Sequence, residues 1–234
     1  MMSGYMGYIV IAGLMSLIGM AVSGRLKAKF ARYSQIPTGS GLSGRDVAET
    51  MLQNYGITDV QIVESRGFLS DHYNPIKKTV ALSPDVYHGR SIAAAAVAAH
   101  ECGHAVQHAT DYAMLRLRSG IVPLVKVSST AQQWLLILTF GGFGAGASGS
   151  STLLLITVIT FAVTALFSFI TLPVEFDASR RALVWLDQTE VARGAEYDGA
   201  KDALKWAAMT YVAAALSALV MVLYLLSRYL ATRD

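Results

Sequence analysis

The feature that most limits how this chain can fold is a set of long apolar segments. Residues 5–22, 153–172 and 206–226 are almost free of charge. Each is close to the roughly 20 residues that a helix needs to cross a bilayer. Residues 5–22 have no basic segment before them and no small-residue cleavage site after them, so we expect a retained helix rather than a signal peptide.

A fourth apolar segment, residues 134–147, is too short to cross a bilayer unless it includes residues 121–133. That extension carries Lys126, Gln132 and Gln133, and polar side chains are costly in lipid. We therefore expect these side chains to face other helices or a wet cavity. A turn over 146–150 is expected to lead into the next span.

The composition agrees with a membrane protein. Hydrophobic residues make up 53% of the chain and charged residues 15%, whereas roughly a quarter of an average soluble domain is charged. The net charge is only +3, and no basic run is interleaved with aromatic residues, so we expect no nucleic-acid partner. Cys102 is the only cysteine, which excludes an intrachain disulfide.

Basic residues next to the spans predict how the chain is oriented. Arg25, Lys27 and Arg32 follow the first span directly, and Arg180 follows the third. Basic residues favour the cytoplasmic side. We therefore expect a multi-pass protein of the plasma (inner) membrane whose segment 25–115 faces the cytoplasm.

Segment 25–115 has the pattern of a small α+β domain. Ser43 is a predicted N-cap with Asp46 at the third helical position, and this helix is expected to end near Asn54. The other expected elements are a strand at 60–63, a turn at 71–75, a strand at 78–82 and a helix at 92–108.

The expected helix contains the sequence His100-Glu101-Cys102-Gly103-His104, which matches the H-E-x-x-H pattern of zinc peptidases. Residues four apart lie one turn above each other, so both imidazoles can bind one zinc ion. Glu101 can then act as the general base on a water that zinc activates. Gly103 is unfavourable in a helix and suggests that another element approaches closely.

A catalytic zinc site needs a third protein ligand. Thr110 stands where a metzincin would have its third histidine, and His108 lies too far along the helix. Glu175 is the better candidate, because it lies just beyond the third span on the same side of the membrane. Asp177 competes with it, but a helix begun after Pro173 would turn Asp177 about 200° away from Glu175.

Together these stretches resemble the YugP-type membrane zinc metallopeptidases, which are distantly similar to HtpX-like gluzincins. The resemblance covers nearly the whole chain and includes the motif, residues 70–75 and residues 172–175. It implies that Glu175 is a zinc ligand. Gluzincins carry an Asp four residues later that holds a ligand histidine, and this chain has Ser179 there, which can accept a hydrogen bond but brings no charge.

Two further features of a peptidase site have candidates in the sequence. An upstream edge strand would hold the substrate in extended form, and residues 78–82 are the candidate. A side chain must also stabilise the oxyanion, and His72, His88 and Tyr211 are the candidates.

The predicted fold is a mainly α membrane protein, with about four transmembrane helices and a small α+β zincin-like catalytic domain. The predicted division of the chain is residues 1–24 as the first transmembrane helix, 25–115 as the domain with the motif, 116–172 as two transmembrane helices, 173–205 as the helical segment with the third ligand, and 206–234 as the last transmembrane helix and tail.

The predicted function is zinc-dependent endopeptidase activity on membrane or membrane-proximal polypeptides. A site-2-type intramembrane protease would need its histidines within a span and an Asp as the third ligand. The charged residues Arg90 and Asp111 bracket this motif helix, which argues against that class.

The alternative outside enzymes is a membrane scaffold or chaperone-like partner that retains the zinc site. The sequence also leaves open a membrane-protein partner or a homo-oligomer.

Overall fold

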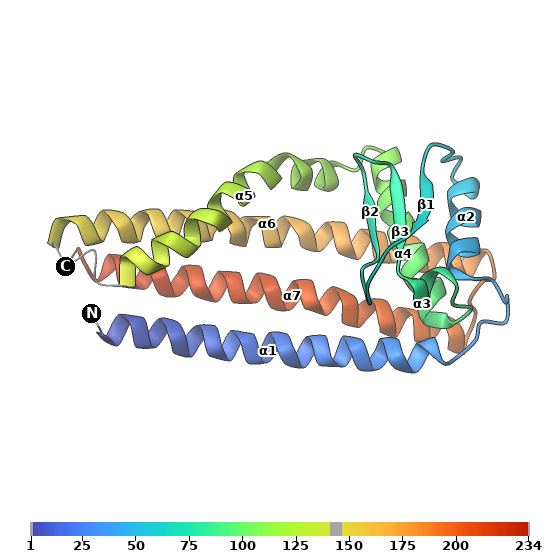
Figure 1. Ribbon diagram of the computed structural model, residues 1–234, viewed down its shortest axis with the longest axis horizontal. Coiled ribbons are helices and arrows are strands. Elements are labelled where there is room, and N and C mark those ends of the chain that lie inside the picture. Colours follow the sequence, from blue (N-terminus) through green and yellow to red (C-terminus); the bar gives the residue numbers. More distant parts are fainter. Residues whose placement is uncertain (1, 141–146, 234) are drawn as a thin grey trace. The chain divides into compact units, whose positions relative to one another are not determined.

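The computed structural model describes residues 2–140 and 147–233 (Figure 1). Within them the chain forms seven helices and one small sheet, as expected of a mainly helical protein. The elements are α1 Met2–Ser34, α2 Gly44–Asn54, β1 Gln61–Glu64, β2 His72–Asn74, β3 Thr79–Leu82, α3 Pro84–Tyr87, α4 Ile92–Ala109, α5 Ala113–Phe140, α6 Ala147–Gln188 and α7 Ala195–Leu230.

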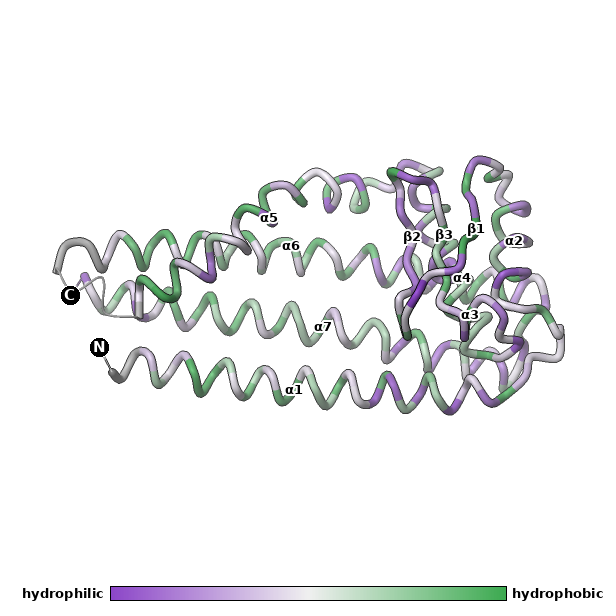
Figure 2. Tube along the Cα trace, viewed as in Figure 1, coloured by the Kyte–Doolittle hydropathy of each residue, from purple (hydrophilic) through white to green (hydrophobic). Residues whose placement is uncertain are grey.

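Four helices are long and apolar enough to cross a membrane, which confirms the predicted number of candidate spans. They are Tyr5–Ser34, Ala113–Thr139, Ser151–Gln188 and Ala195–Leu230. Figure 2 shows apolar residues along much of these helices and polar residues gathered on the strands and the loops around them. The helix α4, which carries the motif, is not among these candidate spans of the described residues.

The chain divides into two compact units. Unit 1 comprises 1–22, 117–172 and 210–234, and unit 2 comprises 23–116 and 173–209. Both histidines of the motif and Glu175 therefore belong to unit 2.

In unit 1, buried apolar residues of α6 and α7 form a cluster that includes Leu154 and Leu225. Gln132 on α5 donates hydrogen bonds from Nε2 to the Thr160 carbonyl and the Thr164 hydroxyl on α6. This confirms that Gln132 faces another helix. Lys126 and Gln133 are exposed instead, because they lie about 240° and 100° around the helix from Gln132 and face other directions.

The sequence predicted two breaks within the range of α6, and both predictions are wrong. Residues 147–150 are helical rather than part of a turn, and Gly146 lies outside the described residues. No new helix begins after Pro173, because α6 runs through it without interruption. Proline removes one backbone hydrogen bond from a helix, and long apolar helices tolerate this loss when neighbouring groups compensate for it.

The sheet of unit 2 corrects two further expectations. Its strand order is β1-β3-β2, with β1 parallel and β2 antiparallel to β3. Residues 79–82 thus form the central strand and not an edge. The strand β2 lies where a turn was expected, because pairing with β3 outweighs the polar composition of His72–Asn74. The turn comes after it, where Asn74 Oδ1 accepts hydrogen bonds from the backbone of Ile76 and Lys77.

The helices α2 and α4 form as the sequence predicts. Ser43 and Asp46 form a complete capping box at the start of α2, with Asp46 in the place usually taken by Glu or Gln. The N-cap of α4 is Ser91, whose side chain accepts a hydrogen bond from the Ala94 backbone. Six alanines of α4 are buried in one core with residues of α2, β3, α6 and α7: Ala93, Ala95, Ala96, Ala98, Ala99 and Ala105. Their small side chains let α4 lie at the centre of unit 2.

Candidate metal centre

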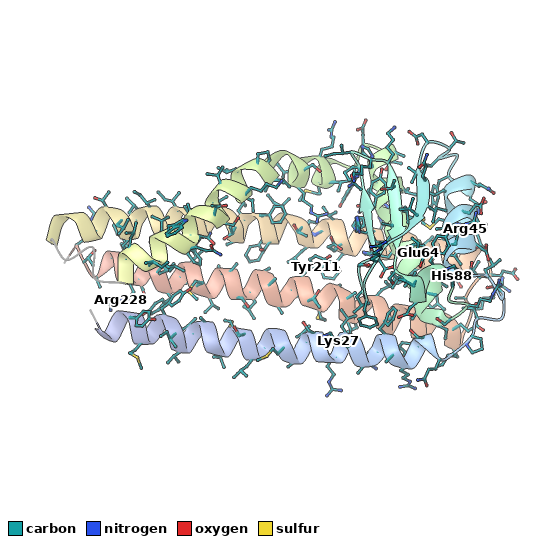
Figure 3. All side chains as sticks on the ribbon, viewed as in Figure 1. Lys27, Arg45, Glu64, His88, Tyr211 and Arg228 are labelled. Carbon is teal, nitrogen blue, oxygen red and sulfur yellow. The ribbon has the colours of Figure 1, made fainter. Side chains whose placement is uncertain are left out.

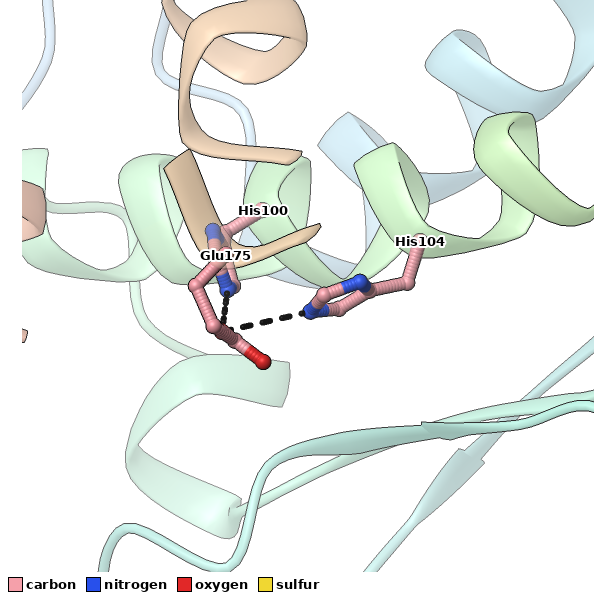
Figure 4. Close-up of side chains that lie close together, drawn as sticks. All are labelled: His100, His104 and Glu175. Carbon is pink, nitrogen blue, oxygen red and sulfur yellow. Dashed lines mark ion pairs between the residues drawn. The ribbon is translucent and has the colours of Figure 1, made fainter. Parts of the chain in front are cut away.

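Three side chains converge in unit 2, two from α4 and one from α6 (Figure 4). His100 Nε2 lies 3.4 Å and His104 Nε2 lies 3.6 Å from Glu175 Oε2. The two imidazole rings have centroids 4.8 Å apart, as expected for residues one helical turn apart. Glu175 is the most deeply buried of the three, with 3% of its side chain exposed.

These distances suit a tetrahedral metal ion. Zinc lies about 2.0–2.2 Å from His nitrogens and carboxylate oxygens, so two ligand atoms of one tetrahedral ion are separated by roughly 3.3 Å. The two separations from Glu175 Oε2 are close to this value, and the three ligand atoms all lie within 4.8 Å of one another. Two histidines and one carboxylate are also the donor set of several catalytic zinc sites.

A close approach of α4 and α6 places Glu175 beside the histidines. A Cβ atom added to Gly103 would lie 2.6 Å from the Ala178 carbonyl oxygen and 3.1 Å from its Cα. Both neighbours belong to the backbone and cannot rotate away. The expectation that Gly103 allows another element to approach closely is therefore confirmed.

The charges around His104 favour a cation. Burial alone would lower the pKa of His104, but the hydrogen bond to Glu175 and the negative charges of Glu101 and Glu175 outweigh burial and raise it. Glu101 is itself buried, with 8% exposed. Two buried carboxylates beside two imidazoles are the electrostatic setting that a divalent metal ion would neutralise.

Comparison with known proteins identifies the family. Residues 8–230 match the model of a family described as "putative neutral zinc metallopeptidase". The chain belongs to this family of zinc metallopeptidases. It is also 40% identical over 210 residues to the putative membrane protease YugP of Bacillus subtilis (strain 168), covering 90% of this chain and 91% of the relative. The expected YugP-type resemblance is thus confirmed. No solved structure matches the chain.

Zinc is accordingly the cofactor of this metallopeptidase family, and the group of His100, His104 and Glu175 could hold it.

The two histidines have different hydrogen-bond partners at Nδ1, the ring nitrogen that faces away from Glu175. His100 Nδ1 lies 3.1 Å from Ser179 Oγ, the contact that the sequence suggested. His104 Nδ1 lies 3.0 Å from Gln107 Oε1. Gln107 is not among the residues predicted from the sequence, although its spacing of three residues from His104 places it on the same helix face.

Asp177 takes no part in the group of three. Its carboxylate accepts hydrogen bonds from Gln107, Arg180 and Arg181. Two residues along a helix correspond to a rotation of about 200°, so Asp177 and Glu175 face different neighbours. The expected rotation is present even though the helix does not begin at Pro173.

The other candidate residues lie outside the group of three. His72 Nδ1 is hydrogen-bonded to the Ser70 carbonyl. His88 Nε2 lies 3.3 Å from Glu64 Oε2, and Figure 3 labels both residues. His108 Nδ1 lies 2.7 Å from the Tyr73 hydroxyl on β2. Tyr211 lies on the part of α7 that belongs to unit 1. The oxyanion role of His72, His88 or Tyr211 stays a prediction.

We expect Cys102 to resist alkylation in the folded protein. Its side chain is fully buried, and burial raises the pKa of the thiol, with a further contribution from Glu101. The thiolate is the reactive form, so maleimide at pH 7–8 should leave the native chain unlabelled and should label it fully after denaturation. Mass spectrometry of the intact chain measures both states. Rapid labelling of the native chain would contradict the burial of Cys102.

Proposed function

We propose that this chain is an integral-membrane zinc endopeptidase with a zincin-like active site in unit 2. The observation that carries the proposal is the convergence of His100 and His104 with Glu175 at 3.4 and 3.6 Å. Membership of a zinc metallopeptidase family and four candidate spans support it. In this proposal His100, His104 and Glu175 bind the ion, and Glu101 transfers protons.

The ion would supply a Lewis acid that polarises the scissile carbonyl and makes a water molecule acidic near neutral pH. Glu101 directly follows His100, and its negative charge acts on His104, so its carboxylate would act on the water that the ion makes acidic. It would accept a proton as the oxygen of water attacks the peptide carbon. The same carboxyl group would then donate that proton to the leaving nitrogen when the C–N bond breaks.

The sheet suggests how an extended substrate binds. The strand β2 is at an edge, so its outer backbone groups are available for pairing with another chain. Strand addition of this kind draws its affinity from the main chain and depends little on sequence. We therefore propose β2, in place of residues 78–82, as the substrate-binding strand, with His72 on it as the first oxyanion candidate to test.

The location and the substrate class follow from the membrane helices. Basic residues such as Arg25 and Lys27, which belong to unit 2, favour the cytoplasmic side of the inner membrane. Because the candidate spans α1, α6 and α7 each extend into unit 2, its substrates would be membrane or membrane-proximal polypeptides. The proposed catalytic domain comprises residues 25–115 together with the helical segment 173–205.

Removing and restoring zinc tests the proposal. The full-length protein in detergent should contain about one zinc per chain and should cleave casein or itself. Chelation should abolish cleavage, and stoichiometric zinc should restore it. A well-folded preparation that never binds zinc would refute the proposal. Bound zinc without cleavage of casein or of membrane protein substrates would favour the alternative function, a membrane scaffold or chaperone-like partner that retains the zinc site.

A further inference from the structure

One buried amide connects the motif helix to the helix that carries Glu175. Gln107 on α4 is 0% exposed. Its Oε1 lies 3.0 Å from His104 Nδ1. Its Nε2 donates hydrogen bonds to the Val174 carbonyl at 2.8 Å and to Asp177 Oδ2 at 2.9 Å, both on α6. All the polar atoms of this side chain are therefore engaged.

The contacts on α6 determine which way the amide points. A backbone carbonyl and an ionised carboxylate accept hydrogen bonds and cannot donate them. The NH₂ group must therefore face Val174 and Asp177, and the amide oxygen must face His104. Because an amide oxygen is only an acceptor, His104 Nδ1 must carry a proton. In a neutral imidazole this leaves the lone pair on Nε2, the atom that lies next to Glu175.

Asp177 is itself held in place. Arg180 and Arg181 both donate hydrogen bonds to its carboxylate. The guanidinium of Arg181 also lies over the Tyr112 ring, 5.8 Å from its centroid. Two cations keep Asp177 ionised and therefore an acceptor.

In the described part of the chain, the contact of His100 Nδ1 does not fix a tautomer in the way that Gln107 does for His104. His100 Nδ1 contacts the hydroxyl of Ser179, and a hydroxyl can either donate or accept. Ser179 is therefore compatible with either tautomer of His100. The orientation of a ligand histidine is thus specified more strongly at His104 than at His100.

We propose that Gln107 is a positioning residue that sets the tautomer and orientation of His104 for zinc and ties its position to α6. This inference rests on the proposed zinc site. Asp177 acts through Gln107 and is not one of the three proposed zinc ligands. The role resembles that of the carboxylates and carbonyls that hold metal-binding histidines elsewhere, but here a neutral amide carries it and a carboxylate orients the amide.

Replacing Gln107 by Met tests this role, because Met has a similar shape and provides no hydrogen-bonding amide. We expect zinc affinity to fall about 10- to 100-fold, the usual effect of losing such a partner. Competition with a chromophoric chelator on the full-length protein in detergent measures it. The exposed residue Gln53 provides the matched control, since Gln53→Met should leave zinc affinity unchanged.

A rescue experiment separates positioning from a merely structural role. Gln107→Glu keeps an acceptor for His104 but places a second carboxylate against Asp177, so zinc affinity should fall. Adding Asp177→Asn supplies an N–H donor toward that carboxylate and should restore part of the lost affinity, although the Val174 carbonyl still faces an acceptor, as expected when hydrogen-bonding partners are energetically coupled. The same Asp177→Asn change combined with Gln107→Met should restore nothing.

Thermal unfolding of the metal-free variants completes the test. Unchanged zinc affinity in Gln107→Met would overturn the inference, as would a failure of the rescue in a chain that unfolds at the wild-type temperature. Failure of the proposed zinc site looks different. In that case His104→Ala and Glu175→Ala would also keep their zinc.

Discussion

Replacing Glu101 by Gln is expected to lower peptide hydrolysis about 10²- to 10⁴-fold, the range attributed to general acid–base catalysis. The amide has nearly the same shape as the carboxylate but cannot accept the proton of the attacking water. Initial rates on casein, or the rate of self-cleavage, measure the loss. Zinc content should stay close to one per chain, because Glu101 is not among the three proposed ligands.

The control for Glu101→Gln is Glu49→Gln, an exposed glutamate on α2, which should retain full activity. Near-wild-type turnover in Glu101→Gln would remove Glu101 from the mechanism. Loss of zinc together with activity would instead make Glu101 part of the metal site. The inactive variant should also retain bound substrates in its own membrane, where they can be isolated.

Replacing Glu175 by Ala is expected to weaken zinc binding by roughly two orders of magnitude or more, since even the outer partners of zinc ligands are worth about 10- to 100-fold. The change removes a carboxylate that is 3% exposed and lies within 3.6 Å of both imidazoles. Chelator competition measures the affinity, and elemental analysis measures the zinc content. Proteolysis should fall with zinc occupancy.

Asp187 provides the matched control for Glu175→Ala, because it is an exposed carboxylate on the same helix α6. Asp187→Ala should bind zinc normally. The Glu175→Ala chain should still fold, which circular dichroism of the metal-free protein can check. Normal zinc occupancy in a folded Glu175→Ala chain would show that the third ligand lies elsewhere.

Local patterns in the sequence were sufficient for much of this structure. The apolar segments predicted four helices long enough to cross a membrane, and the spacing of His100 and His104 predicted two imidazoles on one helix face. The capping residues Ser43 and Asp46 placed the start of α2 correctly. These features depend on residues within a few positions of one another, where helical geometry alone decides which side chains meet.

The sequence was a poorer guide to breaks in helices and to pairing between strands. Pro173 suggested a new helix, yet α6 continues through it. Residues 79–82 were expected at an edge, yet β3 has a neighbour on each side. The strand β2 has too few residues for a pattern of its own and exists because β3 pairs with it. Such outcomes depend on partners distant in the sequence, which local propensity does not describe.

By itself, the sequence determined that this protein has membrane-length helices and a paired-histidine motif with a glutamate between the histidines. It also pointed to Glu175 and Ser179 through topology and family resemblance. Only the tertiary structure decided how these parts meet. The contact of Gly103 with the Ala178 backbone sets the separation of α4 and α6, and the direction of the Gln107 amide depends on two acceptors on α6. A hydrogen bond between residues about 70 positions apart exists only after both helices have packed.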